Sequence, residues 1–126
     1  MKAWIGKSFI IIGIIHTAFG LVVCHTILGQ LVREGLFNTI SGQYDRESAF
    51  WFLFSGFAII IIGALVNWCE HMGRYLPSFL GWSFLAITVS GVVIMPLSGF
   101  WLLFVPTAGI LLRGRKQQKS TEFDSA

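Results

Sequence analysis

Charged residues are scarce in this sequence, and no acidic residue falls inside a long apolar stretch. Only 12% of the 126 residues are charged, about half the share of a typical soluble domain. The six acidic residues lie in polar connections or the tail: Glu34, Asp45, Glu47, Glu70, Glu122 and Asp124. A proton-coupled exporter of the small multidrug type needs a carboxylate within the membrane. The lack of one argues against that class of transporter.

Cysteine and histidine are also rare, which limits metal and redox chemistry. Cys24 and Cys69 fall near the ends of two successive apolar runs, so they are expected on opposite membrane faces without a disulfide. The adjacent residues 69–71 (Cys-Glu-His) cannot converge on one tetrahedral centre, so we predict no metal site and no cofactor. His16 and His25 are nine residues apart and point to opposite sides of a helix. Without a buried carboxylate beside them, we do not expect an enzyme.

Apolar residues, in contrast, dominate the chain. The sequence is 55% hydrophobic and its mean hydropathy is +0.74. About twenty helical residues cross a hydrocarbon core about 30 Å thick. Apolar runs of sufficient length cover residues 5–26, 49–67 and 75–112, and the last has room for two spans joined by a turn at 95–99. We therefore predict an all-α fold, a four-transmembrane-helix bundle formed by residues 1–112.

Prolines and one serine mark the limits of the last two predicted spans. Pro77 suits the first turn of the third helix, where its missing N–H would be unpaired anyway. Pro96 is expected to stop that helix, and Ser98 to cap the next one. Pro106 falls inside the fourth helix, so the sequence predicts a kink near Leu102.

The longest polar connection, residues 29–48, is predicted to contain a short amphipathic helix in the first, outer loop. Four apolar residues recur there at three-to-four spacing: Val32, Leu36, Phe37 and Ile40. The same spacing also fits an ordinary surface helix. At the end of this loop, Asp45 is expected to cap the second span, and Glu47 to favour the positive end of its dipole.

The basic residues predict the orientation of the chain. Seven lie on the side of the termini: Lys2, Lys7, Arg74, Arg113, Arg115, Lys116 and Lys119. Only Arg33 and Arg46 lie on the other side, so both termini are expected in the cytoplasm. The net charge of +3 is spread over helix ends, and no nucleic-acid partner is predicted. Residues 113–126 are basic and then polar, and we expect a disordered cytoplasmic tail.

Small residues recur at seven-residue spacing in the first two spans. Gly6, Gly13 and Gly20 form one line along the first helix, and the second helix has a similar line of Ser55, Gly56 and Gly63. Such lines allow two helix backbones to approach closely. The pattern therefore favours a packing seam, to which we assign Gly6, Gly56 and Gly63. A ligand groove lined by Gly13 and Gly20 is the alternative.

His16 is the one ionisable side chain expected near the middle of a span. It lies eleven residues beyond Ile5, which corresponds to about 16 Å along the helix. Because a charge at that depth is costly, we expect a neutral ring that must find hydrogen bonds. Ser55 and Thr88 fall near the same depth on the second and third spans. The sequence thus predicts a polar layer of these three residues, which either positions the helices or binds a ligand.

Several strings together resemble a known family of small bacterial four-helix membrane proteins, classed as a domain of unknown function. The strings are IGIIHT at 12–17, GLFNT at 35–39 with Asp45-Arg46, FWF at 50–52, and MPLSGFW at 95–101. The resemblance covers roughly residues 5–112. It implies a bacterial cytoplasmic membrane protein and implies no activity.

The function predicted from the sequence is that of an accessory or interaction protein in the membrane. Besides the lipid bilayer, its expected partner is a lipid-like ligand, a second copy of the chain or another membrane protein, in contact with the glycine seams. The alternative is a small transporter or channel that uses His16 within the membrane. Unexplained density beside Gly13 and His16, in a map of the protein determined in lipid, would favour ligand binding.

Overall fold

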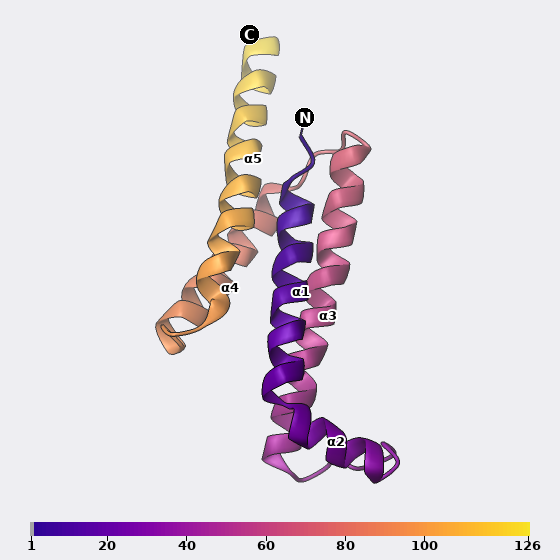
Figure 1. The fold of residues 1–126 in the computed structure, drawn as a ribbon. Helices are drawn as coiled ribbons and strands as arrows, with labels where there is room; N and C mark the ends of the chain where they lie inside the picture. Colours follow the sequence, from indigo (N-terminus) through magenta and orange to yellow (C-terminus); the bar gives the residue numbers. More distant parts are fainter. Residues whose placement is uncertain (1) are drawn as a thin grey trace.

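A computed structural model describes residues 2–126, which fold into helices with no strand in that range (Figure 1). The elements in chain order are α1 (Ile5–Val23), α2 (His25–Arg33), α3 (Tyr44–His71), α4 (Ser78–Ile94), the 3-10 helix η1 (Gly99–Leu103) and α5 (Phe104–Asp124). The predicted all-α class is therefore confirmed.

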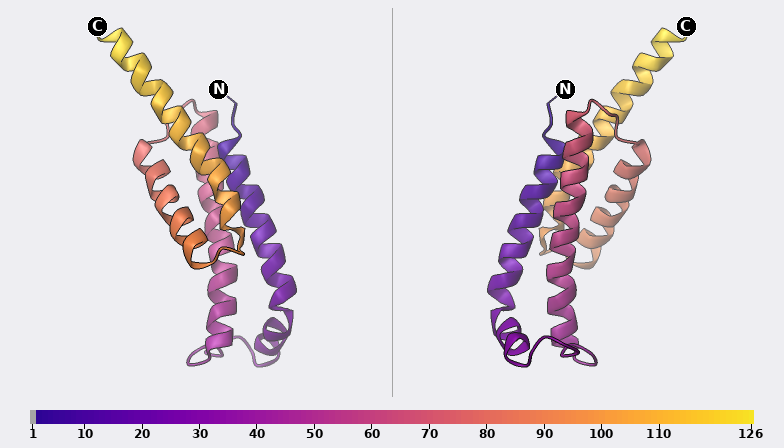
Figure 2. Two further views of the ribbon diagram at one scale, coloured as in Figure 1. Left: turned by 90° about the vertical axis from the view of Figure 1, so that its left-hand side faces the viewer. Right: turned by 90° about the vertical axis from the view of Figure 1, so that its right-hand side faces the viewer.

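The helices form two antiparallel hairpins. The first hairpin pairs α1 with α3, which is longer, and the second pairs α4 with α5. The hairpins meet where α5 and η1 pack on α1, whereas the backbone of α3 approaches neither α4 nor α5 within the described chain. Both termini and the α3–α4 connection share one end of the molecule, and α2 lies at the opposite end (Figures 1 and 2).

The hydrophobic core lies between the hairpins, toward the end where the termini are. Its buried members are Ile5, Phe9, Val66, Leu103 and Ile110. The rings of Phe9 on α1 and Phe84 on α4 have centroids 4.8 Å apart. Figure 2 shows that α4 and the η1 turn stop partway along the first hairpin. In the described part of the chain, the α4–α5 hairpin therefore does not cover the parts of α1 and α3 nearest α2.

Two helices, α1 and α3, are long and apolar enough to cross a membrane, while α4 is apolar but has only 17 residues. At about 1.5 Å per residue, the 28 residues of α3 extend about 42 Å. Only 33% of the most apolar window of α1 and 28% of that of α3 is buried. Most of their apolar surface is thus on the outside of the molecule.

The loop helix is present, but its predicted position is wrong. It covers His25–Arg33, directly after α1, whereas the predicted apolar set began only at Val32. Gly35, Leu36 and Asn38 have φ values of 90°, 64° and 54°, which a right-handed helix does not contain. These left-handed residues turn the chain back toward α3, so the spacing of Leu36, Phe37 and Ile40 arises in a turn.

Asp45 is not the cap of α3, in contrast to the prediction. The N-cap is Gln43, two residues before the predicted cap, and both Asp45 and Glu47 lie in the first turn of the helix. The Glu47 carboxylate accepts a hydrogen bond from the Gly42 N–H at 3.1 Å. Glu47 therefore helps to satisfy the backbone just before the helix.

An ion pair fastens the loop between α2 and α3 to α3. Arg46 donates to the Glu34 carboxylate at 2.6 Å and 2.8 Å and to the Thr39 carbonyl oxygen at 2.8 Å. The hydrogen bond from Arg46 lowers the pKa of Glu34 below its ordinary value. The loop thus keeps this anchor at neutral pH and loses it in acid, as pH falls through the lowered pKa of Glu34.

The last helix differs from its prediction at both ends. Ser98 does act as a cap, since its side chain accepts from the Phe100 N–H, but it caps η1. Pro106 lies in the first turn of α5, where its missing N–H removes no helical bond, so no kink at an interior proline forms. Residues 113–124, expected to be disordered, continue α5 as helix, in agreement with the helix propensities of Arg, Lys and Gln.

Candidate functional site

The glycine lines on α1 and α3 face each other and form one seam. A Cβ atom added at Gly6 would lie 2.2 Å from the backbone nitrogen of Asn67. One added at Gly63 would lie 2.7 Å from the backbone nitrogen of Ile10. Real Cβ atoms do not approach backbone so closely, so only glycine permits this separation of the two helices at these points.

The remaining small residues lie in the same seam. A Cβ at Gly56 would lie 2.4 Å from the Thr17 hydroxyl oxygen, and one at Gly13 would lie 2.6 Å from the Ile60 side chain. At Gly20 the nearest atoms, 2.8 to 2.9 Å away, belong to the side chains of Phe52 and Leu53. The groove proposed as a ligand site is thus filled by α3 from Gly6 to Gly20.

His16 is held against α3 by hydrogen bonds and by stacking. Its Nε2 atom lies 2.9 Å from the Phe52 carbonyl oxygen and 3.1 Å from the Ser55 hydroxyl oxygen. The imidazole also stacks on the Phe52 ring, with centroids 4.0 Å apart and planes inclined by 17°. A carbonyl oxygen can only accept, so this contact requires the proton on Nε2. The ring thus has the hydrogen-bond partners that the sequence analysis expected it to find.

Only two of the three residues predicted for the polar layer come together. Ser55 joins His16, and its hydroxyl also donates to the Phe52 carbonyl oxygen at 2.7 Å. Thr88 is fully buried on α4, but its hydroxyl donates to the Phe84 carbonyl oxygen of its own helix at 2.7 Å. Thr88 is therefore satisfied locally, away from the hydrogen bonds of His16.

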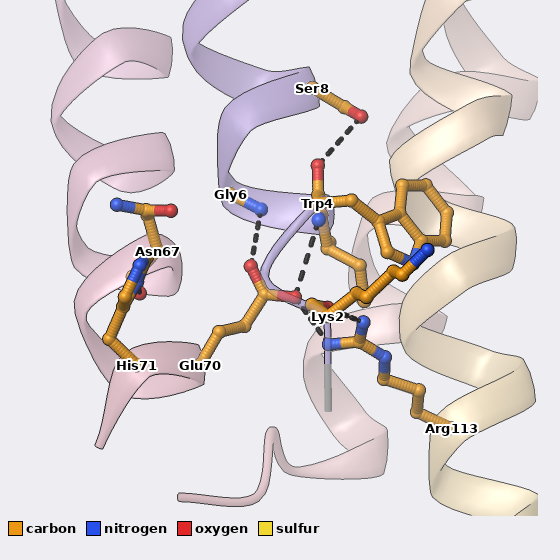
Figure 3. A network of polar contacts seen from close by, with 9 residues as sticks. Lys2, Trp4, Gly6, Ser8, Asn67, Glu70, His71 and Arg113 are labelled. Atoms are coloured by element: carbon orange, nitrogen blue, oxygen red, sulfur yellow. Dashed lines mark hydrogen bonds and ion pairs between the residues drawn. The ribbon is translucent and has the colours of Figure 1, made fainter. Parts of the chain in front are cut away.

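A second polar cluster, formed by Glu70 and Arg113, was not predicted from the sequence (Figure 3). Glu70 lies in the last turn of α3, and its side chain is only 1% exposed. Its carboxylate accepts from the backbone N–H groups of Gly6 at 2.8 Å and Ile5 at 3.3 Å. Arg113 of α5 pairs with the same carboxylate.

The cluster joins the start of α1, the last turn of α3 and the middle of α5. The first N–H groups of α1 have no partner within their own helix, and Glu70 supplies an acceptor with the charge that the positive end of the helix favours. Arg113 also donates to the Lys2 carbonyl oxygen and lies over the Trp4 ring, 5.8 Å from its centroid. Breaking this cluster would free α1, α3 and α5 from one another at that end.

The sequence interpretation placed Glu70 in a polar connection and Arg113 among the basic topology residues. Each is a charged residue at the edge of an apolar run, and this position is the one feature of the sequence that could have indicated a buried pair. Charges next to apolar runs are usually solvated, so the pattern did not distinguish a buried pair. The structure forms the pair because the middle of α5 passes the last turn of α3 beside the start of α1.

In the comparison with known proteins, the sequence profile of a family of unknown function, DUF6463, matches residues 1–117. The chain belongs to this family. The DUF6463 match includes the whole glycine seam, His16, Glu70 and Arg113, and it ends seven residues before the last residue of α5. The resemblance to a family of unknown function is thereby confirmed. No curated protein and no solved structure shows a significant match.

Proposed function

We propose that this DUF6463 member is a multi-pass protein of the bacterial cytoplasmic membrane with four spans and both termini in the cytoplasm. The spans would be α1, α3, α4 and the segment from η1 to the first half of α5. Its role would be that of an accessory protein, which holds a second membrane component rather than catalysing a reaction.

The observation that supports membrane insertion is the inverted distribution of side chains. Small residues occupy the helix contacts, while large apolar side chains point outward. Those more than half exposed include Ile11, Ile14, Phe19, Phe57, Ile61, Leu65 and Val93. A soluble protein rarely presents so continuous an apolar surface to water, whereas lipid tails solvate it.

The distribution of positive charge supports the orientation. The termini and the α3–α4 connection share one end, where the seven basic residues of the inner side are located. Arg33 and Arg46 lie at the opposite end, near α2. The asymmetry follows the rule that cytoplasmic loops are enriched in Lys and Arg.

The uncovered outer halves of α1 and α3 support a role in holding a partner helix. Phe19 on α1 and Phe54 on α3 are 61% and 53% exposed, and both come from the halves of these helices that are nearest α2. A transport path along the glycine seam is less well supported, because α3 fills the seam and His16 already has partners. A further membrane helix, from another protein or a second copy, would cover this surface.

The proposed topology predicts which engineered cysteines react from outside. With Cys24 and Cys69 replaced by serine, Gln43→Cys in the loop before α3 should be labelled in intact cells by a membrane-impermeant thiol reagent. Ser120→Cys on α5 should be labelled only after the membrane is permeabilised. Labelling of Ser120→Cys alone in intact cells would invert the orientation, and labelling of both would rule out an even number of spans.

The proposed partner surface predicts a site-specific crosslink. A photoreactive phenylalanine analogue at Phe54 should yield a discrete crosslinked protein band after illumination of cells. The same analogue at Phe79, which is 69% exposed at the start of α4, should react with lipid and give no such band. Lack of a band at Phe54, or equal bands at both positions, would contradict a partner helix on the outer half.

A further inference from the structure

We propose that a cavity at the end of the molecule near the termini binds a phosphate-bearing anion, at the level of lipid headgroups. The cavity has a volume of about 430 Å³ and lies between the α3–α4 connection and α5. Its lining includes Arg74, Tyr75, Arg113, Lys116, Gln117 and Ser120. The inference deepens the proposed function by naming a ligand class, and it depends on the proposed membrane insertion.

One polar face of α5 forms a wall of the cavity. Arg113, Lys116, Gln117 and Ser120 are spaced at three and four residues, so their side chains lie on the same side of the helix. They offer a guanidinium, an ammonium, an amide and a hydroxyl group, all of which donate hydrogen bonds. Across from them, the α3–α4 connection contributes the Arg74 guanidinium. Such a convergence of donors suits phosphate oxygens.

The charge in the cavity remains positive after its acidic residues are counted. Glu70 already accepts from two backbone N–H groups and pairs with Arg113, so its charge is compensated. Neither Arg74 nor Lys116 forms an ion pair within residues 2–126. Asp124 also lines the cavity, eight positions beyond Lys116 on α5, which is about 12 Å along the axis. Two cationic side chains are thus available for a ligand.

The position of the cavity in the proposed membrane selects the kind of anion. It lies beside the connection between the end of α3 and the start of α4, where the apolar helices are followed by polar residues. Tyr75, which is 69% exposed, lies at this boundary, as aromatic residues at membrane interfaces do. Lipid phosphates occupy the same level, and basic pockets between helices on the cytoplasmic side bind anionic headgroups. A soluble phosphate ester has the same recognition chemistry.

The test compares anionic and neutral lipid on the purified full-length protein. Thermal unfolding in detergent is measured while phosphatidylglycerol or phosphatidylcholine with the same acyl chains is added at constant ionic strength. Phosphatidylglycerol should raise the Tm saturably and phosphatidylcholine should not. The double variant Arg74→Gln/Lys116→Gln should need about tenfold more phosphatidylglycerol for the same shift, because two charges near the headgroup are lost.

The matched control is Arg115→Gln/Lys119→Gln. It removes the same charge from the opposite face of α5, outside the cavity, and should retain the parent response within about twofold. Equal losses in both double variants would overturn the site in favour of diffuse attraction. No preference of the parent for phosphatidylglycerol would also overturn the lipid assignment, unless glycerol 3-phosphate stabilises the parent but not Arg74→Gln/Lys116→Gln. That last result would assign the site to a soluble phosphate.

The two proposals fail in different ways. If labelling and crosslinking give the expected results while neither lipid nor glycerol 3-phosphate changes the Tm, the phosphate site is wrong and the proposed function stands. If Gln43→Cys is protected in intact cells while the phosphate response is present, the topology is wrong and the anion site stands.

Discussion

Replacing Glu70 by Gln is expected to lower the Tm of the purified protein in detergent by roughly 10 °C or more. The side chain is 1% exposed, and its carboxylate both caps α1 and pairs with Arg113. Glutamine keeps the shape and one acceptor but leaves the Arg113 guanidinium without its counter-charge. Removing one partner of a buried ion pair typically costs about 3–5 kcal/mol. Thermal unfolding followed by tryptophan fluorescence measures the effect.

A double-mutant cycle separates the ion pair from simple loss of packing. Arg113→Gln alone should also be destabilising, because Glu70 is then buried without its cation. The double variant Glu70→Gln/Arg113→Gln should lose clearly less than the sum of the two single variants, since neither charge is left unpaired. Purely additive losses would show that the two residues act independently.

The ion pair between Glu34 and Arg46 provides the matched comparison at the other end of the molecule. It is similar in chemistry, but the Glu34 side chain is 49% exposed. Arg46 is 12% exposed but keeps its hydrogen bond to the Thr39 carbonyl oxygen, and glutamine at the exposed position 34 can still accept from it. Glu34→Gln should therefore lower the Tm less than Glu70→Gln does. A loss as large as that of Glu70→Gln would mean that burial is not the source of the effect.

Replacing Gly6 by Ala is expected to destabilise the protein by about 2–3 kcal/mol, although only one methyl group is added. That methyl group would lie 2.2 Å from the Asn67 nitrogen and 2.4 Å from the Asn67 Cα, both of them backbone atoms. Backbone cannot rotate away, so α1 and α3 must separate and lose contacts along the seam. Unfolding in detergent would measure the loss.

Two other glycines make this a graded series. Gly20→Ala should cost less than Gly6→Ala, because the atoms near Gly20 belong to the side chains of Phe52 and Leu53. Gly29 on α2 has nothing within 4 Å of an added Cβ, so Gly29→Ala should be neutral or stabilise by about 0.5–1 kcal/mol. If Gly6→Ala and Gly29→Ala behaved alike, the two helices would not be in close contact at Gly6.

The sequence by itself determined the helical class and the small-residue seam. Both depend on local patterns: the length of an apolar run limits a helix, and the spacing of Gly6, Gly13 and Gly20 places them on one side of α1 whatever lies opposite. The sequence also predicted that His16 lies far from any charged side chain of its own helix. The loop helix was displaced in the prediction, because its limit depends on the left-handed residues Leu36 and Asn38.

Only the tertiary structure decided which residues meet across helices. Glu70 and Arg113 are 43 residues apart, and their pairing depends on how far α5 extends past Leu112 and where it crosses the start of α1. His16 reaches Ser55 but not Thr88, because α1 packs along α3 while α4 packs mainly on α5. The spacing of residues along a helical sequence predicts which side chains lie on the same face of that helix. The rotation and offset of one helix against another come from the packing of all of them, and these decide where buried charges find partners.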